Sequence, residues 1–230
     1  MAQVVIRTSG LTKVYRDTLV PVNALGGVDL EIREGEFTAI VGPSGSGKST
    51  LLHLLGGLDY PTAGHVEIGG HHLNQLQDKE LIDFRLHHIG FVFQAYNLIP
   101  VLTAKENVEF IMLLQQLPAR EREARAIQLL REVGLGERLH NRPAELSGGQ
   151  QQRVAVARAL ASRPSFILAD EPTANLDSSA AGNLLQLMAQ MNAREKATFI
   201  FSTHDQRVIE KARRVITLED GKIVSDLSQA

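Results

Sequence analysis

The chain lacks cysteine, and its formal net charge is only -2 over 230 residues. The absence of cysteine excludes disulfides, thiolate zinc sites and cysteine nucleophiles, and it agrees with a reducing compartment. Near-neutral charge supplies no overall attraction to nucleic acid or anionic lipid, so no nucleic-acid partner is expected. Hydrophobic residues make up 43% of the chain, which is too many for a disordered regulator. The sequence therefore predicts one globular domain or a tightly fused pair.

Long hydrophobic runs are also missing. No window approaches the roughly 18 consecutive apolar residues that suggest a transmembrane helix. Residues 1–10 carry one arginine and no apolar stretch long enough for the centre of a secretory signal. We therefore expect a cytoplasmic chain with no segment inserted in a membrane.

The spacing of the apolar residues predicts an α/β fold. Residues 28–32 alternate between apolar and polar, which is typical of a strand with one wet face. Residues 37–41 are almost all apolar, as in a parallel strand that is buried on both faces. Further strands are expected at 4–11, 65–68, 89–93, 166–169, 198–202, 215–218 and 222–226, and helices at 49–55, 78–86 and within 103–163.

Local signals place several ends of these elements. Thr103 and Glu106 form a candidate capping box, Gly134 is a helix stop signal, and Asp220-Gly221 predicts a hairpin turn. The order runs from β-rich to helical to α/β, so we infer a mainly parallel core with an antiparallel β layer. We interpret 1–230 as a single domain whose core comprises about 1–94 and 164–230, with a helical subdomain inserted at about 95–163.

A phosphate-binding loop is predicted between the strand at 37–41 and the helix that follows. Residues 42–49 read G-P-S-G-S-G-K-S, which matches the P-loop pattern G-x-x-x-x-G-K-[ST]. In that pattern, glycines let backbone N–H groups surround phosphate oxygens, the lysine reaches the β- and γ-phosphates, and the serine hydroxyl binds Mg²⁺. A flexible Gly/Ser turn is disfavoured by the strand-loop-helix context. The candidate nucleotide-binding residues are Gly42, Ser44, Gly45, Ser46, Gly47, Lys48, Ser49 and Thr50.

Two acids follow the apolar strand at 166–169. Asp170 can hold Mg²⁺ from the side opposite Ser49, and Glu171 can polarise the attacking water as a general base. A strand that merely ends in solvated acids would look the same in isolation. The catalytic interpretation therefore depends on the combination with the loop at 42–49.

A third motif indicates the family that the sequence resembles. Residues 146–153 read L-S-G-G-Q-Q-Q-R, which is similar to the signature motif of ATP-binding cassette (ABC) ATPases, and the resemblance covers about residues 4–226. Ser147 is an N-cap candidate, and the helix behind it would present its positive end to phosphate. The resemblance implies a head-to-tail homodimer in which ATP on one copy is also contacted by the other copy's Ser147, Gly148, Gly149 and Gln150.

Further site residues follow from the resemblance, position by position. Gln94 matches the Q-loop glutamine and is implied to be a catalytic residue and a metal ligand. His204 matches the switch histidine, which is implied to contact the γ-phosphate, and Asp177 lies in the D-loop expected at the dimer interface. Tyr15 falls where the family has an aromatic ring that stacks on adenine. The implied cofactors are ATP and Mg²⁺, with Ser49, Gln94 and Asp170 around the metal.

Shorter segments resemble the branch that contains lipoprotein-releasing (LolD-like) and macrolide-efflux (MacB-like) ATPases. They include G-G-L-D at 56–59 and A-D-E-P-T at 169–173, whereas Ala174 and Ser202 depart from residues common in that branch. This resemblance implies an integral membrane permease of the FtsX, MacB or LolC kind as a partner, and a peripheral position on the cytoplasmic face of the inner membrane. The apolar stretch at 96–102 would either dock this permease or pack internally.

Other functions remain as alternatives. A membrane-associated regulator of cell-wall enzymes would share the mechanism, and only its membrane subunit would distinguish it. An ABC ATPase acting on ribosomes or DNA is disfavoured because the chain has one uninterrupted cassette and no basic excess. A metabolic P-loop kinase would have no use for residues 146–153. The pairs His71-His72 and His87-His88 lack an accompanying ligand set, so we expect surface histidines rather than a metal site.

Overall fold

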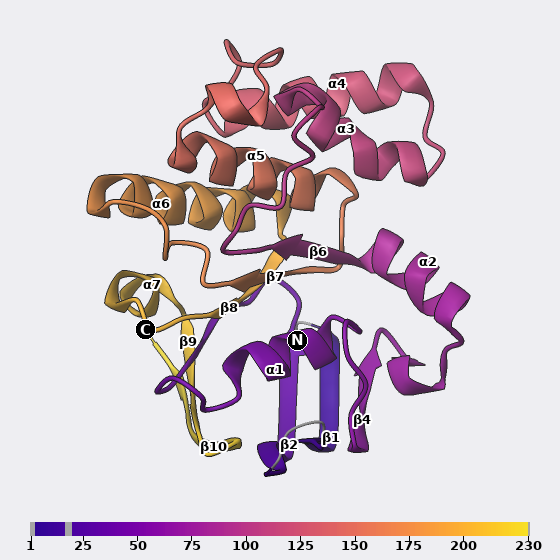
Figure 1. Ribbon diagram of the computed structural model, residues 1–230, viewed down its shortest axis with the longest axis vertical. Helices are drawn as coiled ribbons and strands as arrows, with labels where there is room; N and C mark the ends of the chain where they lie inside the picture. The colour runs from indigo at the N-terminus through magenta and orange to yellow at the C-terminus, as the bar shows by residue number, and fades with distance from the viewer. Residues whose placement is uncertain (1–2, 17–19, 230) are drawn as a thin grey trace.

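The computed structural model describes residues 3–16 and 20–229, and its strands form two sheets (Figure 1). The four-stranded sheet is antiparallel, with the order β2-β1-β4-β5. Its strands are β1 (Val4–Tyr15), β2 (Val22–Arg33), β4 (Ala63–Ile68) and β5 (His71–His72). This sheet confirms the predicted antiparallel layer from the N-terminal part of the chain.

The six-stranded sheet has the order β10-β9-β3-β8-β7-β6. All of its neighbouring strands are parallel except β9 and β10, so the predicted mainly parallel core is also confirmed. Its strands are β3 (Phe37–Val41), β6 (Ile89–Val92), β7 (Phe166–Asp170), β8 (Thr198–Ser202), β9 (Arg214–Glu219) and β10 (Lys222–Ser228).

The helices lie on both sides of this parallel sheet. Figure 1 shows α3, α4 and α5 stacked at one end of the molecule, with α6 between them and the sheet, and α1 on the side of the antiparallel sheet. The helices are α1 (Lys48–Leu55), α2 (Asp78–His88), α3 (Ala104–Leu114), α4 (Ala119–Glu132), α5 (Gly148–Ala161), α6 (Ser178–Glu195) and α7 (Gln206–Lys211). Short 3-10 turns occupy Leu73–Gln75 and Pro143–Glu145.

The predicted capping signals act where the sequence places them. Thr103 Oγ1 accepts from the Glu106 backbone N–H, and the Glu106 carboxylate accepts from the Thr103 N–H at 2.8 Å, which completes the capping box of α3. Gly134, at φ 75°, follows the end of α4, where the left-handed region favours glycine. Asp220 and Gly221 adopt φ 46° and 74° in the turn between β9 and β10.

The buried strands divide their side chains between two cores. Phe199 and Phe201 of β8 face the core beneath the helical stack, whereas Ile200 between them faces the core shared with α1 and the antiparallel sheet. The same division holds in β7 for Ile167 and Leu168. Successive side chains of a strand point to opposite faces, so a continuous apolar run is what a sheet covered on both faces requires.

The first two strands are longer than predicted. Gly10, at φ 55°, lies inside β1, and Gly27, at φ 94°, lies inside β2. The pairing of β1 and β2 shifts register between Thr8 and Leu11 and again at Thr12. These bulges absorb the glycines and let pairing continue to Tyr15 and Val22.

No helix among residues 3–16 and 20–229 is long and apolar enough to cross a bilayer.

The two histidine pairs are partly buried. In each pair one ring is exposed and the other is half-buried: His72 packs against His65, and His88 stacks on Phe84 with ring centroids 4.5 Å apart. The half-buried rings therefore contribute to packing, which the expectation of surface histidines did not include.

Candidate nucleotide site

The loop at 42–47 has a backbone that glycine alone accommodates at two positions. At Gly42, with φ 152°, a Cβ atom would lie 2.0 Å from the Leu218 carbonyl oxygen, and at Gly47, with φ 98°, 2.3 Å from the Ala24 carbonyl oxygen. Both distances are far inside van der Waals contact, so a larger residue would displace the loop. The loop is thus held against β2 and β9 in a conformation that depends on glycine at these two positions.

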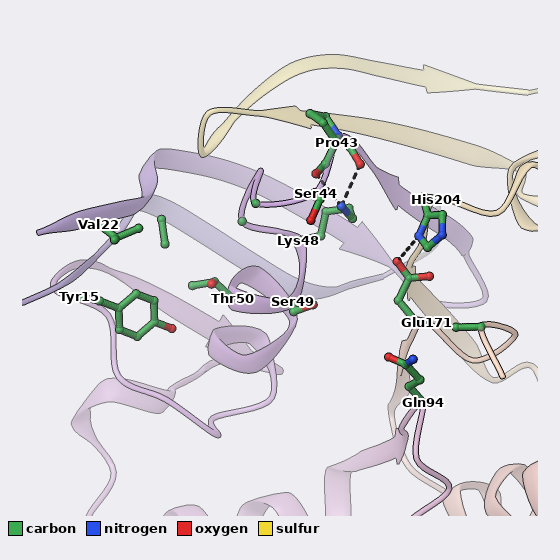
Figure 2. Close-up of a pocket in the computed structure, with 15 residues that line it drawn as sticks. Tyr15, Val22, Pro43, Ser44, Lys48, Ser49, Thr50, Gln94, Glu171 and His204 are labelled. Carbon is green, nitrogen blue, oxygen red and sulfur yellow. Dashed lines mark hydrogen bonds and ion pairs between the residues drawn. The ribbon is translucent and has the colours of Figure 1, made fainter. Parts of the chain in front are cut away.

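This loop borders a cavity of about 690 Å³ that opens between β1, β2, the start of α1 and the ends of the parallel strands. Figure 2 shows Tyr15 and Val22 at one end, Glu171, His204 and Gln94 at the other, and Lys48 and Ser49 between them. The predicted residues that line the cavity are Tyr15, Gly42, Ser44, Gly45, Gly47, Lys48, Ser49, Thr50, Gln94, Glu171 and His204. Val22, Ala24, Pro43 and Ala174 also line it and were not predicted.

Lys48 is the cation at the centre of the cavity. Its Nζ donates to the carbonyl oxygens of Gly42 and Pro43, at 2.8 and 2.9 Å, and the residue is only 8% exposed. Ser46, within the loop, is buried and is not among the described residues that line the cavity, and its backbone N–H donates to the Pro43 carbonyl. The ammonium group therefore closes the loop on itself while facing the space where phosphates would lie.

Asp170 and Ser49 meet at the end of β7. The Ser49 hydroxyl donates to Asp170 Oδ1 at 3.0 Å, although the two residues are 121 positions apart. His53 Nε2 lies 4.0 Å from the other carboxylate oxygen, a neighbour that sequence reasoning missed. The paired hydroxyl and carboxylate oxygens are hard donors of the kind that Mg²⁺ prefers, so these residues fit that ion.

Glu171 and His204 lie side by side because β7 and β8 are adjacent parallel strands, with Asp170 opposite Ser202. Glu171 Oε1 lies 2.8 Å from His204 Nδ1, and Glu171 Oε2 accepts from the Thr203 hydroxyl at 3.4 Å. The Glu171 backbone has φ 46°, in the left-handed region that a glutamate rarely occupies. A strained backbone at a cavity-lining acid is the pattern found at functional sites.

Gln94 follows β6 and is held from the loop after β7. Its backbone carbonyl accepts from Asn175 Nδ2 at 3.0 Å, and its side-chain Nε2 lies 3.5 Å from Asn175 Oδ1. Asn175 lies two residues before Asp177, which the resemblance places in the D-loop, but its contact with Gln94 was not predicted. The cavity thus receives Gln94 and Glu171 from two loops that are bonded to each other.

Tyr15 is held by Lys13 and Asp59, neither of which was predicted to contact it. Its hydroxyl donates to Asp59 Oδ2 at 3.0 Å, and Lys13 Nζ lies 4.8 Å from the ring centroid while bonding Asp59 Oδ1 at 2.6 Å. Burial and the Asp59 carboxylate raise the pKa of the Tyr15 hydroxyl above its ordinary value. Because the hydroxyl and one face of the ring are engaged, the tyrosine can offer its other face to a flat ligand.

The motif at 147–150 lies elsewhere in the chain. Ser147 Oγ accepts from the Gln150 N–H at 3.3 Å and caps α5, as predicted, and Asp177 Oδ1 accepts from the Ala180 N–H and caps α6. Among the described residues that line the cavity, neither 147–150 nor Asp177 appears. A single chain therefore brings together the predicted loop, acids, glutamine and histidine. Its second predicted phosphate-binding segment, residues 147–150, does not line the same cavity.

Asp205, which follows His204, anchors the start of α7 and yields a stability prediction. Its carboxylate accepts from the Arg207 side chain at 2.7 Å, from the Arg207 N–H at 2.9 Å and from the Thr173 hydroxyl at 2.8 Å. These bonds, with Arg207 as the largest cause, lower the pKa of Asp205 from 3.8 to about 2. Since the folded pKa is depressed, this stabilisation is complete above the unfolded pKa and disappears as pH falls towards 2.

We expect Asp205→Asn to lower the free energy of unfolding by about 1–2 kcal/mol at pH 7, and by roughly half as much at pH 3. Urea denaturation at the two pH values measures both quantities. Asp83→Asn is the matched control, because the Asp83 side chain is 74% exposed. An equal loss for Asp205→Asn at pH 3 and pH 7 would contradict this assignment.

Comparison with known proteins agrees with this geometry. The family model described as ABC transporter matches residues 25–174. An uncharacterized ABC transporter ATP-binding protein of Thermotoga maritima is 52% identical over 211 residues, which cover 92% of this chain and 90% of that protein. The lipoprotein-releasing system ATP-binding protein LolD of Legionella pneumophila (strain Lens) is 44% identical, covering 97% of this chain and 98% of its own length.

The resemblance extends to a fused protein and to solved structures. The macrolide export ATP-binding/permease protein MacB of Hyphomonas neptunium is 49% identical over 98% of this chain, which spans only 35% of that protein. A dimeric structure of the ATP-binding cassette MJ0796 in a post-hydrolysis state, bound to ADP and Pi, aligns with a TM-score of 0.88 and 45% identity. It covers 97% of this chain and 98% of the MJ0796 chain. This chain therefore belongs to the ABC transporter family, as an ATP-binding subunit with ATPase activity in the branch that contains LolD and MacB.

Proposed function

We propose that this ATPase subunit works as a head-to-tail pair of copies beneath an integral membrane permease. On this proposal, ATP binding closes the pair, and hydrolysis opens it. The observation that carries the proposal is the single cavity that holds Tyr15 at one end and Glu171, His204 and Gln94 at the other, with the Lys48 loop between. Those two ends suit the base and the γ-phosphate of one nucleotide.

The residues around Lys48 would bind the phosphates. The Lys48 ammonium would turn from the carbonyls of Gly42 and Pro43 to the β- and γ-phosphates, with the loop N–H groups around them. Ser49, Asp170 and Gln94 would hold Mg²⁺, which when bound would offset phosphate charge. Tyr15 would stack on the adenine ring.

The acids and bases at the strand ends would carry the proton transfer. Glu171 would accept a proton from the attacking water, which requires an ionised carboxylate within hydrogen-bond reach of that water. His204, 2.8 Å from Glu171, would orient the carboxylate and contact the γ-phosphate. Gln94 would position the water from the opposite side, since it enters the cavity from β6 rather than from β7.

A second set of contacts to the phosphates would come from residues 147–150 of the partner copy. Residues 147–150 form the positive end of α5 but are not among the described residues that line this chain's cavity, so they are free to reach the nucleotide of another copy. Shifting a dimer from 1:99 to 99:1 closed takes about 5.5 kcal/mol, or roughly 2.7 kcal/mol for each of two ATP molecules. We also propose that residues 95–163 form the helical subdomain that carries residues 147–150, and that 1–94 and 164–230 form the core.

We propose an inner-membrane permease of the FtsX, MacB or LolC kind as the partner, with the subunit on its cytoplasmic face. The names of the relatives, a lipoprotein-releasing ATP-binding protein and an ATP-binding/permease protein, support this choice. In the stretch at 96–102, Leu98 packs against the helical core, whereas Val101 is 72% exposed. Val101 is therefore the residue available for docking, and Leu98 serves internal packing.

Val101→Glu is expected to reduce the membrane-bound fraction of the protein at least fivefold, because a charge would be buried against an apolar partner. The ATPase rate of the purified subunit should stay within twofold of wild type. Val224→Glu is the matched control, since Val224 is 55% exposed on β10. Fractionation of cells and identification of the co-purified membrane protein provide the measurement.

Two results would count against the proposal. Unchanged membrane recovery of Val101→Glu would exclude docking at this stretch. Failure of the wild-type subunit to recover any integral membrane protein would refute the permease partnership itself.

A further inference from the structure

Gln152 occupies an unusual position on α5. It is fully buried, with 0% of its surface exposed, and it lies two residues after the motif at 147–150. Its side-chain Nε2 donates to the carbonyl oxygens of Phe93, at 3.3 Å, and Pro172, at 2.9 Å. These two carbonyls belong to different loops, one after β6 and the other after β7.

Each carbonyl lies directly beside a residue to which the proposed function gives a catalytic role. Phe93 precedes Gln94, and Pro172 follows Glu171. The two loops are also bonded to each other, since Asn175 Nδ2 donates to the Gln94 carbonyl at 3.0 Å. One amide group on α5 therefore holds the backbone on both sides of the reacting centre.

The loop after β6 has further contacts with α5. Arg158 Nη2 donates to the Tyr96 carbonyl at 3.0 Å, and Arg158 also donates to the Asn97 carbonyl. At the start of the helix, a Cβ atom on Gly148 would lie 2.7 Å from the Tyr96 hydroxyl. The helix and this loop are thus in contact from Gly148 to Arg158, but of these side chains Gln152 is the one that also bonds the loop carrying Glu171.

Packing alone does not account for a glutamine here. The Gln152 Oε1 atom is buried without a hydrogen-bond partner, whereas both N–H groups of the amide have carbonyl acceptors. An apolar side chain of similar length would fill the same space and leave no orphaned oxygen on the helix. Compared with an apolar side chain, the amide adds two N–H donors, which bond the carbonyls of Phe93 and Pro172.

We propose that Gln152 is a positioning residue that couples the start of α5 to Gln94 and Glu171, so that this chain's two half-sites move together. The inference rests on the proposed function, in which residues 147–150 bind the partner's ATP. When that end of α5 is drawn to the partner's nucleotide, Gln152 moves with it and carries both loops. Hydrolysis in the chain's own cavity then depends on nucleotide in the partner's cavity.

Gln152→Met tests this coupling, because methionine keeps the length of the side chain and removes both donors. Gln128→Met is the matched control, since Gln128 is an exposed helical glutamine whose Nε2 bonds Glu132 Oε1 on the same helix, α4. Melting temperature, ATP affinity and ATPase rate as a function of ATP concentration are measured for each protein. For Gln152→Met we expect kcat to fall about tenfold, ATP affinity to stay within twofold, and the Hill coefficient to drop from near 2 towards about 1.

A second variant covers the case in which Gln152→Met does not fold. Gln152→Asn stays polar but is too short to reach both carbonyls, and it should give the same kinetic pattern. A kcat within twofold of wild type, or a reduced kcat with an unchanged Hill coefficient, overturns the inference. Glu171→Gln is assayed alongside: if it retains wild-type turnover, the proposed site fails, whereas if it is inactive and Gln152→Met is normal, only the coupling fails.

Discussion

Glu171→Gln is expected to lower kcat for ATP hydrolysis by at least about 10²-fold and to trap a dimer in the presence of MgATP. Glutamine keeps the size of the side chain and can still meet His204 and the Thr203 hydroxyl, which now lie 2.8 and 3.4 Å from the two carboxylate oxygens. It cannot accept a proton from water. Nucleotide should therefore bind and close the pair, but the γ-phosphate that joins the copies would persist.

Steady-state hydrolysis and size-exclusion chromatography with and without ATP measure the two effects. Glu137→Gln is the matched control, because Glu137 is exposed beyond the end of α4. Wild-type turnover in Glu171→Gln would show that Glu171 is not the general base. If the variant binds ATP and is inactive but stays monomeric even with the membrane subunit present, the assignment of the base stands. ATP-driven closure of the pair would then be refuted.

Lys48→Met should weaken ATP binding by roughly 10- to 100-fold and reduce hydrolysis below detection. The lysine is the buried cation of the loop, and each charge-assisted bond that it could make to phosphate is worth about 1.5–3 kcal/mol. Removing it also leaves the carbonyls of Gly42 and Pro43 without their donor. Binding and turnover should thus fall together, whereas Glu171→Gln should separate them.

Titration calorimetry with ATP provides the affinity, and Lys79→Met, on the exposed surface of α2, is the control. The unfolding temperature of Lys48→Met reports whether the loop remains formed. Wild-type affinity in a folded Lys48→Met protein would show that the cavity does not bind the triphosphate through this loop.

The parts of the fold that the sequence predicts well are those with a local physical cause. β3 has its predicted bounds, Phe37–Val41, because a short apolar run ends at a glycine that must adopt φ 152°. The Thr103 box and the Asp220-Gly221 turn likewise depend on side chains within a few residues. The predicted strands at 4–11 and 28–32 are shorter than β1 and β2, because pairing that continues past a bulge depends on the partner strand.

The residues of the site likewise differ in how well the sequence predicts them. The contiguous loop at 42–49 and the pair Asp170-Glu171 can be recognised from short patterns. Lys13, Asp59 and Val22 cannot, since they reach Tyr15 and the cavity only after three separate segments have packed together. Gln152 was read as part of the motif at 146–153, and nothing in the sequence tells a buried helical glutamine from an exposed one.

At Glu171, the left-handed backbone conformation lowers the stability of the fold, whereas the carboxylate is the proposed general base for hydrolysis. A non-glycine residue held at φ 46° costs on the order of 1 kcal/mol or more, and glycine would remove that cost. Selection for thermal resistance alone, in the laboratory or by a design algorithm, would favour losing the carboxylate here. The chain keeps glutamate in an unfavourable conformation, so engineering a hardier version should leave this residue fixed and seek its gains elsewhere.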